Sequence, residues 1–446
     1  MARLFVMMLL EFFIWGAWLP LIFGYLPSLG FSAVAPPAEI ASWIPQRIAF
    51  LFSEQSLILN AFPIAAIVGM LFSNQFADRN FSAESFLAVS HLIGGAAMIG
   101  LAYTQSFWPF FGFMMLHCLL YVPTISITNS IAFAHMNDPQ KQFGPVRMGG
   151  TIGWILAAWP FTFILVDWDK VAVAQSSGFV DWLGNVLGSG LTGDPLKAAT
   201  RWTFIVAGVA SILLTLFSLT LPHTPAKKAD GRTEKLAWLE AAKLLKHPFV
   251  LVLWFVTLID AFVHNCYFNW TGSFLGSEAV GIPGNWIMPV MSIGQVAEIL
   301  TMAVLGFVLT RLGWRATMIV GILGHAARFA VYAFFPQHAW MIVLVQVLHG
   351  ICYAFFFATV YIFVDEFFPK DARASAQGLF NLMILGIGAL IANSICPYLM
   401  SRVTENGVTD FRTLFLIPCG FALGAAVLLG LFFRPPAKAT PQNVGH

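Results

Sequence analysis

The chain has 446 residues, of which 59% are hydrophobic and only 10% are charged, and its net charge is +2. A soluble domain has about 45–50% apolar and about 25% charged residues. This composition excludes a water-soluble globular protein and predicts an integral membrane protein. The five cysteines lie in apolar runs without a CxxC pair, so a disulfide or zinc framework has little support. We expect no cofactor, no metal and no nucleic-acid partner.

The N-terminal segment carries one basic residue, Arg3, and then an apolar run of spanning length. It lacks a small-residue cleavage site, so we interpret it as an uncleaved first span and not as a signal peptide. A spanning helix needs about 20 mostly apolar residues. The predicted fold is all-α with twelve transmembrane helices, at residues 4–26, 54–76, 84–104, 108–133, 147–167, 202–221, 248–275, 286–309, 315–335, 339–364, 373–399 and 412–433.

Basic residues predict how these spans are oriented. Most of the 23 Lys and Arg residues fall in segments that the twelve spans place on the side of the N-terminus. Cytoplasmic loops carry the excess of Lys and Arg in membrane proteins. We therefore predict a multi-pass protein of the cytoplasmic (inner) membrane with both termini in the cytoplasm.

A basic linker at residues 222–247 separates the sixth predicted span from the seventh. It divides the chain into a six-helix bundle at 1–221 and a second six-helix bundle with a short tail at 248–446. Within it, Thr233–Leu245 has the pattern of an amphipathic helix lying on the inner membrane surface. Two such halves resemble the major facilitator superfamily, whose substrates bind near the midplane between the halves. Asn74–Arg79 resembles the superfamily's loop motif in degenerate form.

Short motifs along the whole chain carry a closer resemblance. They lie at Ile14–Trp18, Tyr121–Thr124, Arg147–Gly153, Thr220–Pro225, Met291–Glu298, Arg373–Gly378 and Asn406–Asp410. With these motifs the chain is similar to the nucleoside:proton symporters of the major facilitator superfamily. The resemblance implies a transporter and not an enzyme, importing a nucleoside by alternating access of a central cavity with a proton as coupling ion. We expect a monomer in the lipid bilayer.

The fifth predicted span begins with three residues that share one helical face, Arg147, Thr151 and Trp154. The resemblance implies that Arg147 and Thr151 bind substrate, with hydrogen bonds to ribose hydroxyls or base carbonyls. Trp154 stands where the family has an aromatic, and we expect it to stack on a base. Two other interpretations stay open: Arg147 pairs with Asp138 or lipid phosphate, and Trp154 is a packing residue. Gly149 and Gly153, on the same helix, predict close approach of a neighbouring helix.

Gln295 and Glu298 are three residues apart in span eight and share a face. An amide offers both a donor and an acceptor to a nucleobase edge. A permanently charged carboxylate is costly at membrane depth, so a carboxyl group there readily takes up and releases a proton. We therefore predict that Gln295 binds substrate and that Glu298 binds substrate and couples protons, against the alternative of a structural polar bridge.

Span seven contains a polar run of Asp260, His264, Asn265 and Asn269. Asn265 and Asn269 are four residues apart and share a face. The resemblance implies two amide contacts with substrate in this region, and we assign them to Asn265 and Asn269. Because the alignment slips by one residue, His264 stays open as the counterpart of Asn265. Asp260 is a possible partner of His264.

Span ten contributes His349 and Tyr353, which are four residues apart. By the resemblance, His349 stands where the family has a tyrosine that faces substrate, and Tyr353 stands where it has an aromatic. Ala354 stands where the family has an aspartate implicated in proton coupling. The proton must then be carried elsewhere, and the candidates are Glu298, Glu11 and His349, the last because histidine titrates near neutral pH. Otherwise coupling is altered or lost.

Two further ionisable residues lie at membrane depth. Glu11 in span one is either a second proton site or a group that holds Arg328 or another span by hydrogen bonds. For Arg328 in span nine we predict a structural partner. Two other functions on the same kind of chain are a proton-coupled sugar or oligosaccharide transporter and a polytopic membrane enzyme. Fold alone does not separate the sugar transporter from a nucleoside transporter. The absence of a nucleophile, base or metal cluster motif makes the enzyme the weaker rival.

Overall fold

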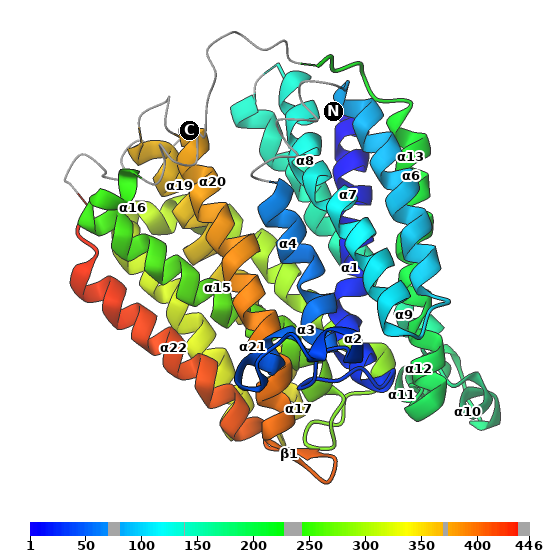
Figure 1. The fold of residues 1–446 in the computed structure, drawn as a ribbon. Coiled ribbons are helices and arrows are strands. Elements are labelled where there is room, and N and C mark those ends of the chain that lie inside the picture. Colours follow the sequence, from blue (N-terminus) through cyan, green and yellow to red (C-terminus); the bar gives the residue numbers. More distant parts are fainter. Residues whose placement is uncertain (70–80, 138, 227–242, 369–372, 436–446) are drawn as a thin grey trace.

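The computed structural model describes residues 1–69, 81–137, 139–226, 243–368 and 373–435. The motif Asn74–Arg79 and most of the predicted surface helix Thr233–Leu245 lie outside the described residues. Apart from one short hairpin, the described chain is helical where it is regular (Figure 1). The predicted all-helical membrane fold is therefore confirmed.

The first part of the chain forms one group of helices, in blue to green in Figure 1. Its long helices and their continuations are α1 (Ala2–Ser28), α3 (Glu54–Leu59), α4 (Ala61–Val68), α6 (Ala83–Leu101), α7 (Phe107–Ala134), α8 (Pro139–Ala158), α9 (Phe161–Ile164) and α13 (Trp202–Ser218). Short helices in the connecting loops are α2 (Ala38–Ala41), η1 (Gln46–Phe52), α10 (Trp168–Val173), α11 (Phe179–Gly188) and α12 (Gly193–Thr200).

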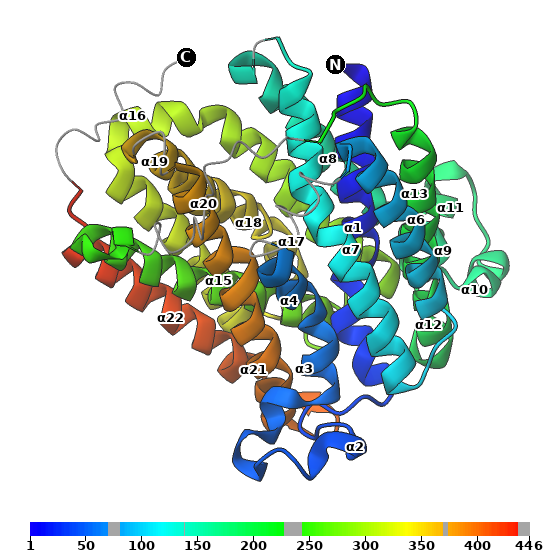
Figure 2. The ribbon, with the colours of Figure 1, turned by 45° about the horizontal axis from the view of Figure 1, so that its top comes forward.

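The second part forms a second group beside the first, and Figure 2 shows the two groups from another angle. Its helices are η3 (Leu244–Lys246), α15 (Pro248–Leu275), η4 (Gly284–Trp286), α16 (Ile287–Phe334), α17 (Ala339–Leu344), α18 (Val347–Cys352), η5 (Tyr353–Ala358), α19 (Thr359–Phe367), α20 (Arg373–Asn381), η6 (Leu382–Ile387), α21 (Gly388–Arg402) and α22 (Phe411–Phe432). Both η5 and η6 are π-helical turns.

Within the described residues, nine helices are long and apolar enough to cross a membrane. A tenth is counted if the segments 46–52 and 54–68, which meet at a bend of 42°, form one broken span. The helix α16 counts once although it covers two predicted spans, 286–309 and 315–335. Gly313 separates them, because its φ of 73° breaks the helical path.

Apolar side chains form two large buried clusters. One joins residues of the range 4–221 with Met288, and the other joins residues of the range 250–433. Large apolar side chains also stay exposed on the outer faces of the helices, among them Leu219, Leu300 and Phe307. A surface of this kind suits the hydrocarbon core of a bilayer, where exposed apolar groups are not penalised.

Helix α8 packs directly on α1, and two glycines make this possible. A β-carbon on Gly153 would lie 2.0 Å from the backbone oxygen of Leu9, and one on Gly149 would lie 2.6 Å from that of Phe5. No side chain fits in such a space. The close approach predicted from the glycine spacing is confirmed, and it brings the face of α8 that carries Arg147 alongside α1.

The two groups of helices are joined by hydrogen bonds near the loops of residues 27–53 and 168–200. Asn60 Nδ2 donates to Ser394 Oγ over 2.8 Å, and Asn393 Nδ2 donates to the backbone oxygen of Leu59 over 3.0 Å. Trp286 of η4 donates from Nε1 to the backbone oxygen of Leu187, in the loop of residues 168–200, over 2.7 Å. These contacts close the end of the bundle that lies opposite the N-terminus (Figure 1).

Candidate functional site

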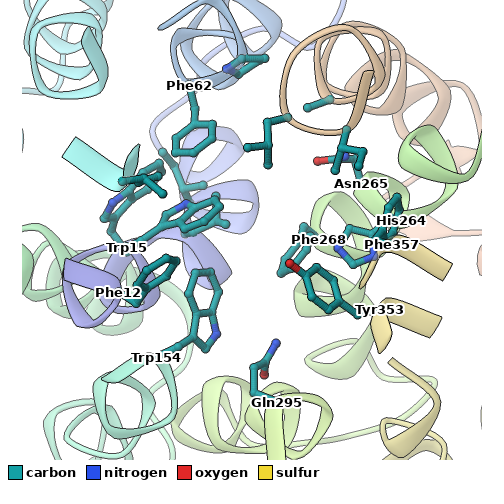
Figure 3. A pocket seen from close by; sticks show the side chains of 18 of the residues that line it. Phe12, Trp15, Phe62, Trp154, His264, Asn265, Phe268, Gln295, Tyr353 and Phe357 are labelled. Atoms are coloured by element: carbon teal, nitrogen blue, oxygen red, sulfur yellow. The ribbon is translucent and has the colours of Figure 1, made fainter. Parts of the chain in front are cut away.

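A cavity of about 230 Å³ lies between the two groups of helices. Aromatic rings line it from both sides: Figure 3 shows Phe12, Trp15, Phe62 and Trp154 facing His264, Phe268, Tyr353 and Phe357. Polar groups interrupt this lining at a few points, which are Arg147, Thr151, Asn265, Gln295, Glu298, His349, Tyr361 and Asn393. Apolar walls with a few convergent polar groups are typical of small-molecule sites.

From α8, the three residues predicted to share a face all line the cavity: Arg147, Thr151 and Trp154. The Arg147 guanidinium lies 4.1 Å from the centre of the Phe12 ring, a cation–π distance. Trp154 meets Trp15 edge to face, with ring centres 5.2 Å apart. Asp138, the alternative partner of Arg147, lies outside the described residues. The helical spacing therefore predicted correctly that these three side chains converge.

From α16, Gln295 and Glu298 line the same cavity, as their spacing predicts. Gln295 is buried, and its side-chain oxygen has no hydrogen-bond partner among the residues that the structure describes. An unpaired buried amide oxygen is costly, so it suits a bound donor. Glu298 is half-buried, and Arg147 is the cation whose field acts on it.

From α15, His264 and Asn265 line the cavity, whereas Asn269 is not part of the lining. Asn265 Nδ2 donates to the backbone oxygen of Ala261 over 2.8 Å. Asn269 instead donates to Asn393 Oδ1 over 2.9 Å. His264 and Asn265, the two candidates for the first of the two predicted amide contacts, thus both line the cavity. Asn269 touches it only through Asn393, which is itself a lining residue.

From the next helices, His349 of α18 and Tyr353 of η5 line the cavity. The His349 ring lies nearly parallel to that of His264, with centres 4.9 Å apart. Behind it stands Arg328, fully buried, whose Nη1 is 3.0 Å from His349 Nδ1. The predicted structural partner of Arg328 exists, and it includes a residue of the site.

A family model described as Nucleoside H+ symporter matches residues 1–43, 35–181 and 179–438. The chain belongs to the nucleoside H+ symporter family. A relative from Escherichia coli (strain K12), named "Putative nucleoside transporter YegT", is 30% identical over 444 residues, which cover 97% of this chain and 93% of the relative. The xanthosine permease of the same strain is 25% identical over 465 residues, covering 100% of this chain and 98% of the permease.

Among solved structures, the nucleoside transporter NupG has a TM-score of 0.76 at 23% identity, covering 98% of this chain and 99% of that chain. A D-xylose-proton symporter has a TM-score of 0.64 at 16% identity, covering 99% of each chain. These likenesses show that the symporter has the fold of secondary transporters.

Glu11 of the symporter does not line the cavity. It is fully buried within the first group of helices, where its carboxyl oxygens lie 2.9 Å from His91 Nε2 and 2.8 Å from Thr124 Oγ1. Glu11 thus joins α1 to α6 and α7 by hydrogen bonds. Holding another span by hydrogen bonds is one of the two roles that the sequence predicts for it. Arg328, suggested there as one partner, contacts His325 and His349 instead.

Asp260 has a different neighbour from the one that its position suggests. Its carboxyl oxygen lies 3.5 Å from His325 Nε2, and His264 is not paired with it. His325 belongs to α16, which packs against α15, so the neighbour of Asp260 comes from another helix and not from four residues along its own.

Several lining residues of the symporter were missed from the sequence. Trp15 and Trp18 line the cavity, and the indole N–H of each is buried with no hydrogen-bond partner in the described segments. Both lie in a motif of the family, but a tryptophan in a span is equally compatible with packing. Asn393 had a clearer signal, because it is an amide within an apolar run. Phe357 and Ile384 lie on the π-helical turns, which frequently occur at functional sites.

Proposed function

We propose that this symporter imports a nucleoside together with a proton, by alternating exposure of the central cavity to the two sides of the membrane. The single supporting observation is the cavity itself. Aromatic rings and a small set of polar groups from both halves of the chain meet there, and Glu298 is the one carboxyl group among the described lining residues. We also propose twelve spans, with 1–221 and 248–446 as the two moving halves, acting as a monomer in the inner membrane.

The binding pose follows from the chemistry of the lining. A nucleobase has two flat π-faces, and Trp154, Trp15 and Phe268 offer aromatic partners at the cavity wall. Stacking on an aromatic is worth about 1–3 kcal/mol per base. Arg147 and Thr151 supply donors for ribose hydroxyls or base carbonyls. Gln295 and Asn265 face them from the second half of the chain and offer amides to the base edge.

The proton step rests on the relation between Glu298 and Arg147. A bare carboxylate in an apolar site is costly, and it is stabilised either by a proton or by a nearby cation. Arg147 is that cation. A solute that occupies the guanidinium leaves Glu298 to be neutralised by a proton, so solute and proton bind together. Glu11 and His349 are the other two groups that the sequence offers for the proton.

The contacts between the two halves indicate which state of the transport cycle the structure represents. Hydrogen bonds between the halves gather near loops 27–53 and 168–200, at the end opposite the N-terminus. With the termini in the cytoplasm, this is the outer side of the membrane. The structure then corresponds to an inward-facing state, and rocking of the two halves exposes the same residues outward.

The test is uptake of labelled nucleosides by proteoliposomes, with and without an imposed pH gradient. We expect Glu298→Gln to abolish accumulation against a gradient, while exchange of labelled for unlabelled nucleoside across the membrane persists. Glu278→Gln is the matched control, since Glu278 is an exposed residue outside the lining. Undiminished accumulation by the Glu298 variant contradicts this proton step, and uptake of no nucleoside by the unmodified protein contradicts the function.

A sugar transporter on the same fold is the second candidate, because a D-xylose-proton symporter shares this fold. The lining argues against it. Sugar hydroxyls need many paired donors and acceptors, whereas Phe12, Phe62, Phe357 and the three lining tryptophans present flat apolar surface. Competition of uridine uptake by free ribose decides the point: we expect none at concentrations where unlabelled uridine competes fully.

A further inference from the structure

Arg328 is a fully buried cation directly behind the cavity wall. Its Nη1 lies 3.0 Å from His349 Nδ1, and its Nη2 lies 3.0 Å from His325 Nδ1. The guanidinium carbon also lies 4.2 Å from the centre of the Tyr267 ring. The guanidinium is therefore held in one position by groups on α15, α16 and α18.

The hydrogen bonds with Arg328 determine the protonation state of both histidines. A guanidinium only donates hydrogen bonds and has no acceptor. Each Nδ1 that faces Arg328 must therefore accept a hydrogen bond through its lone pair, so neither Nδ1 carries a proton. A histidine with a bare Nδ1 is neutral and carries its proton on Nε2. His325 and His349 are thus both neutral Nε2–H tautomers as long as Arg328 stays in place.

Asp260 balances the buried positive charge through His325. One oxygen of Asp260 lies 3.5 Å from His325 Nε2, and within the described part of the chain neither oxygen has a hydrogen-bond partner. An unpaired charge of either sign in an apolar interior is strongly destabilising. The Nε2–H of His325 points the ring's positive end at Asp260. The other titratable groups against this cluster are His264, Tyr267, Tyr332 and Cys352.

The His349 ring has a second nitrogen, Nε2, which does not face Arg328, and neighbouring rings hold the His349 ring in place. The ring is buried between Tyr267, with centres 4.4 Å apart, and His264, with centres 4.9 Å apart. It also lines the cavity, so the remaining Nε2–H is available to a solute there. A locked ring with a fixed tautomer presents a donor and never an acceptor.

We propose that Arg328 is a positioning residue that fixes His349 as a neutral Nε2–H donor, and that the site thereby selects bases with an acceptor at that edge. The acceptor is a carbonyl oxygen of the base. This inference rests on the proposed transport of nucleosides and deepens it. It also separates His349 from the proton step, because a proton on Nδ1 would place two cations face to face.

The first test measures the tautomer without any nucleoside. Protein labelled with ¹⁵N at its histidines, in lipid bilayers, is examined by solid-state NMR, and the His349 signals are identified by their loss in His349→Phe. We expect a bare Nδ1 and a protonated Nε2 on His349. In Asp260→Asn/Arg328→Gln, which removes both buried charges together, we expect a mixture of tautomers. A protonated Nδ1 in the unmodified protein overturns the positioning role.

The second test measures selectivity in proteoliposomes. Inosine is compared with purine riboside, which lacks its carbonyl group, and uridine with its analogue lacking the 4-carbonyl. We expect the unmodified protein to favour at least one carbonyl-bearing partner by about tenfold in kcat/KM, a usual effect of leaving a buried donor unpaired. His349→Phe and the double variant should bring that ratio near one. His338→Phe, at an exposed position, should keep it.

The outcomes separate the two claims. Equal selectivity in the unmodified protein and in His349→Phe overturns the donor role of His349, even if nucleosides are transported. Absence of all nucleoside uptake by the unmodified protein overturns the proposed function and the claim about base selection with it. The NMR result still decides whether Arg328 fixes the tautomer.

Discussion

Asn269 of α15 donates from Nδ2 to Oδ1 of Asn393 over 2.9 Å, and Asn393 passes the contact on to the first half of the chain by donating to Leu59 O over 3.0 Å. The next residue, Ser394, accepts from Asn60 Nδ2 over 2.8 Å. Since Asn393 also lines the cavity, one side chain joins the solute site to the contact that closes the bundle opposite the N-terminus.

We expect Asn60→Ala to loosen this closure, because it removes the hydrogen bond to Ser394. A net hydrogen bond is worth about 1 kcal/mol, which is roughly a fivefold change in an equilibrium. A cysteine placed at Ile58, a buried lining residue, reports the change. Its reaction with a membrane-impermeant thiol reagent from the outer side should accelerate about fivefold in the Asn60→Ala background. Ile58→Cys alone is the reference, and equal rates would contradict a gating role.

Arg147→Lys tests the shape of the donor group separately from its charge. Lysine keeps the cation near Phe12 but lacks the planar fork of donors that arginine offers to a polar solute. We expect KM for nucleoside to rise about tenfold, with the amount of folded protein unchanged. Arg412→Lys is the matched control, because that guanidinium also lies over a phenylalanine ring, at 5.2 Å from Phe334, and is not part of the lining. An unchanged KM would remove Arg147 from the site.

Gly153→Ala tests the packing that places α8. The added β-carbon would lie 2.0 Å from Leu9 O, and the obstruction is backbone, which moves only with the helix. Overpacking usually costs about 1–3 kcal/mol. We expect a lower melting temperature in detergent and reduced uptake. Gly424→Ala, where nothing lies within 4 Å of the new carbon, should leave both unchanged. Equal melting temperatures for the two variants would show that α8 shifts at little cost.

Asp410 caps the N-terminus of α22, and its pKa is lowered by hydrogen bonds from the Thr413 hydroxyl and backbone N–H. A lowered pKa means that the cap contributes stability above the ordinary value of 3.8 and loses it as pH falls through the folded-state value. Asp410→Ala should lower stability by about 1 kcal/mol at neutral pH, a usual cost of losing a cap.

The control for this cap is Asp410→Asn, because asparagine caps equally well but has no proton to gain. The unfolding temperatures of the unmodified protein and the Asp410→Asn variant, measured in detergent, should therefore be equal at neutral pH. They should differ only as the pH falls to 3.8 and below. A difference that is constant with pH would contradict the capping explanation.

The family motif at Asn406–Asp410 is explained by this corner and not by the solute. The strands β1 (Thr404–Glu405) and β2 (Val408–Thr409) pair in an antiparallel hairpin. Asn406 and Gly407 make its two-residue turn with positive φ values of 51° and 81°. Asn-Gly is the pair that such a turn prefers. The spacing between the turn and the cap is therefore set by local backbone geometry, which a short sequence motif can determine without tertiary contacts.

The amino-acid sequence alone determined the membrane class, the helices and the convergence of Arg147, Thr151 and Trp154, because hydropathy and a period of 3.6 residues are local properties. It also paired Gln295 with Glu298 in the same way. Only the tertiary structure decided that Asn265 reaches the cavity while Asn269, on nearly the same face, turns to Asn393. It likewise decided that His349 is held by Arg328 and that Glu11 is held by His91. The physical reason is that helical periodicity says which side chains share a face, whereas the partner of that face depends on how distant helices pack.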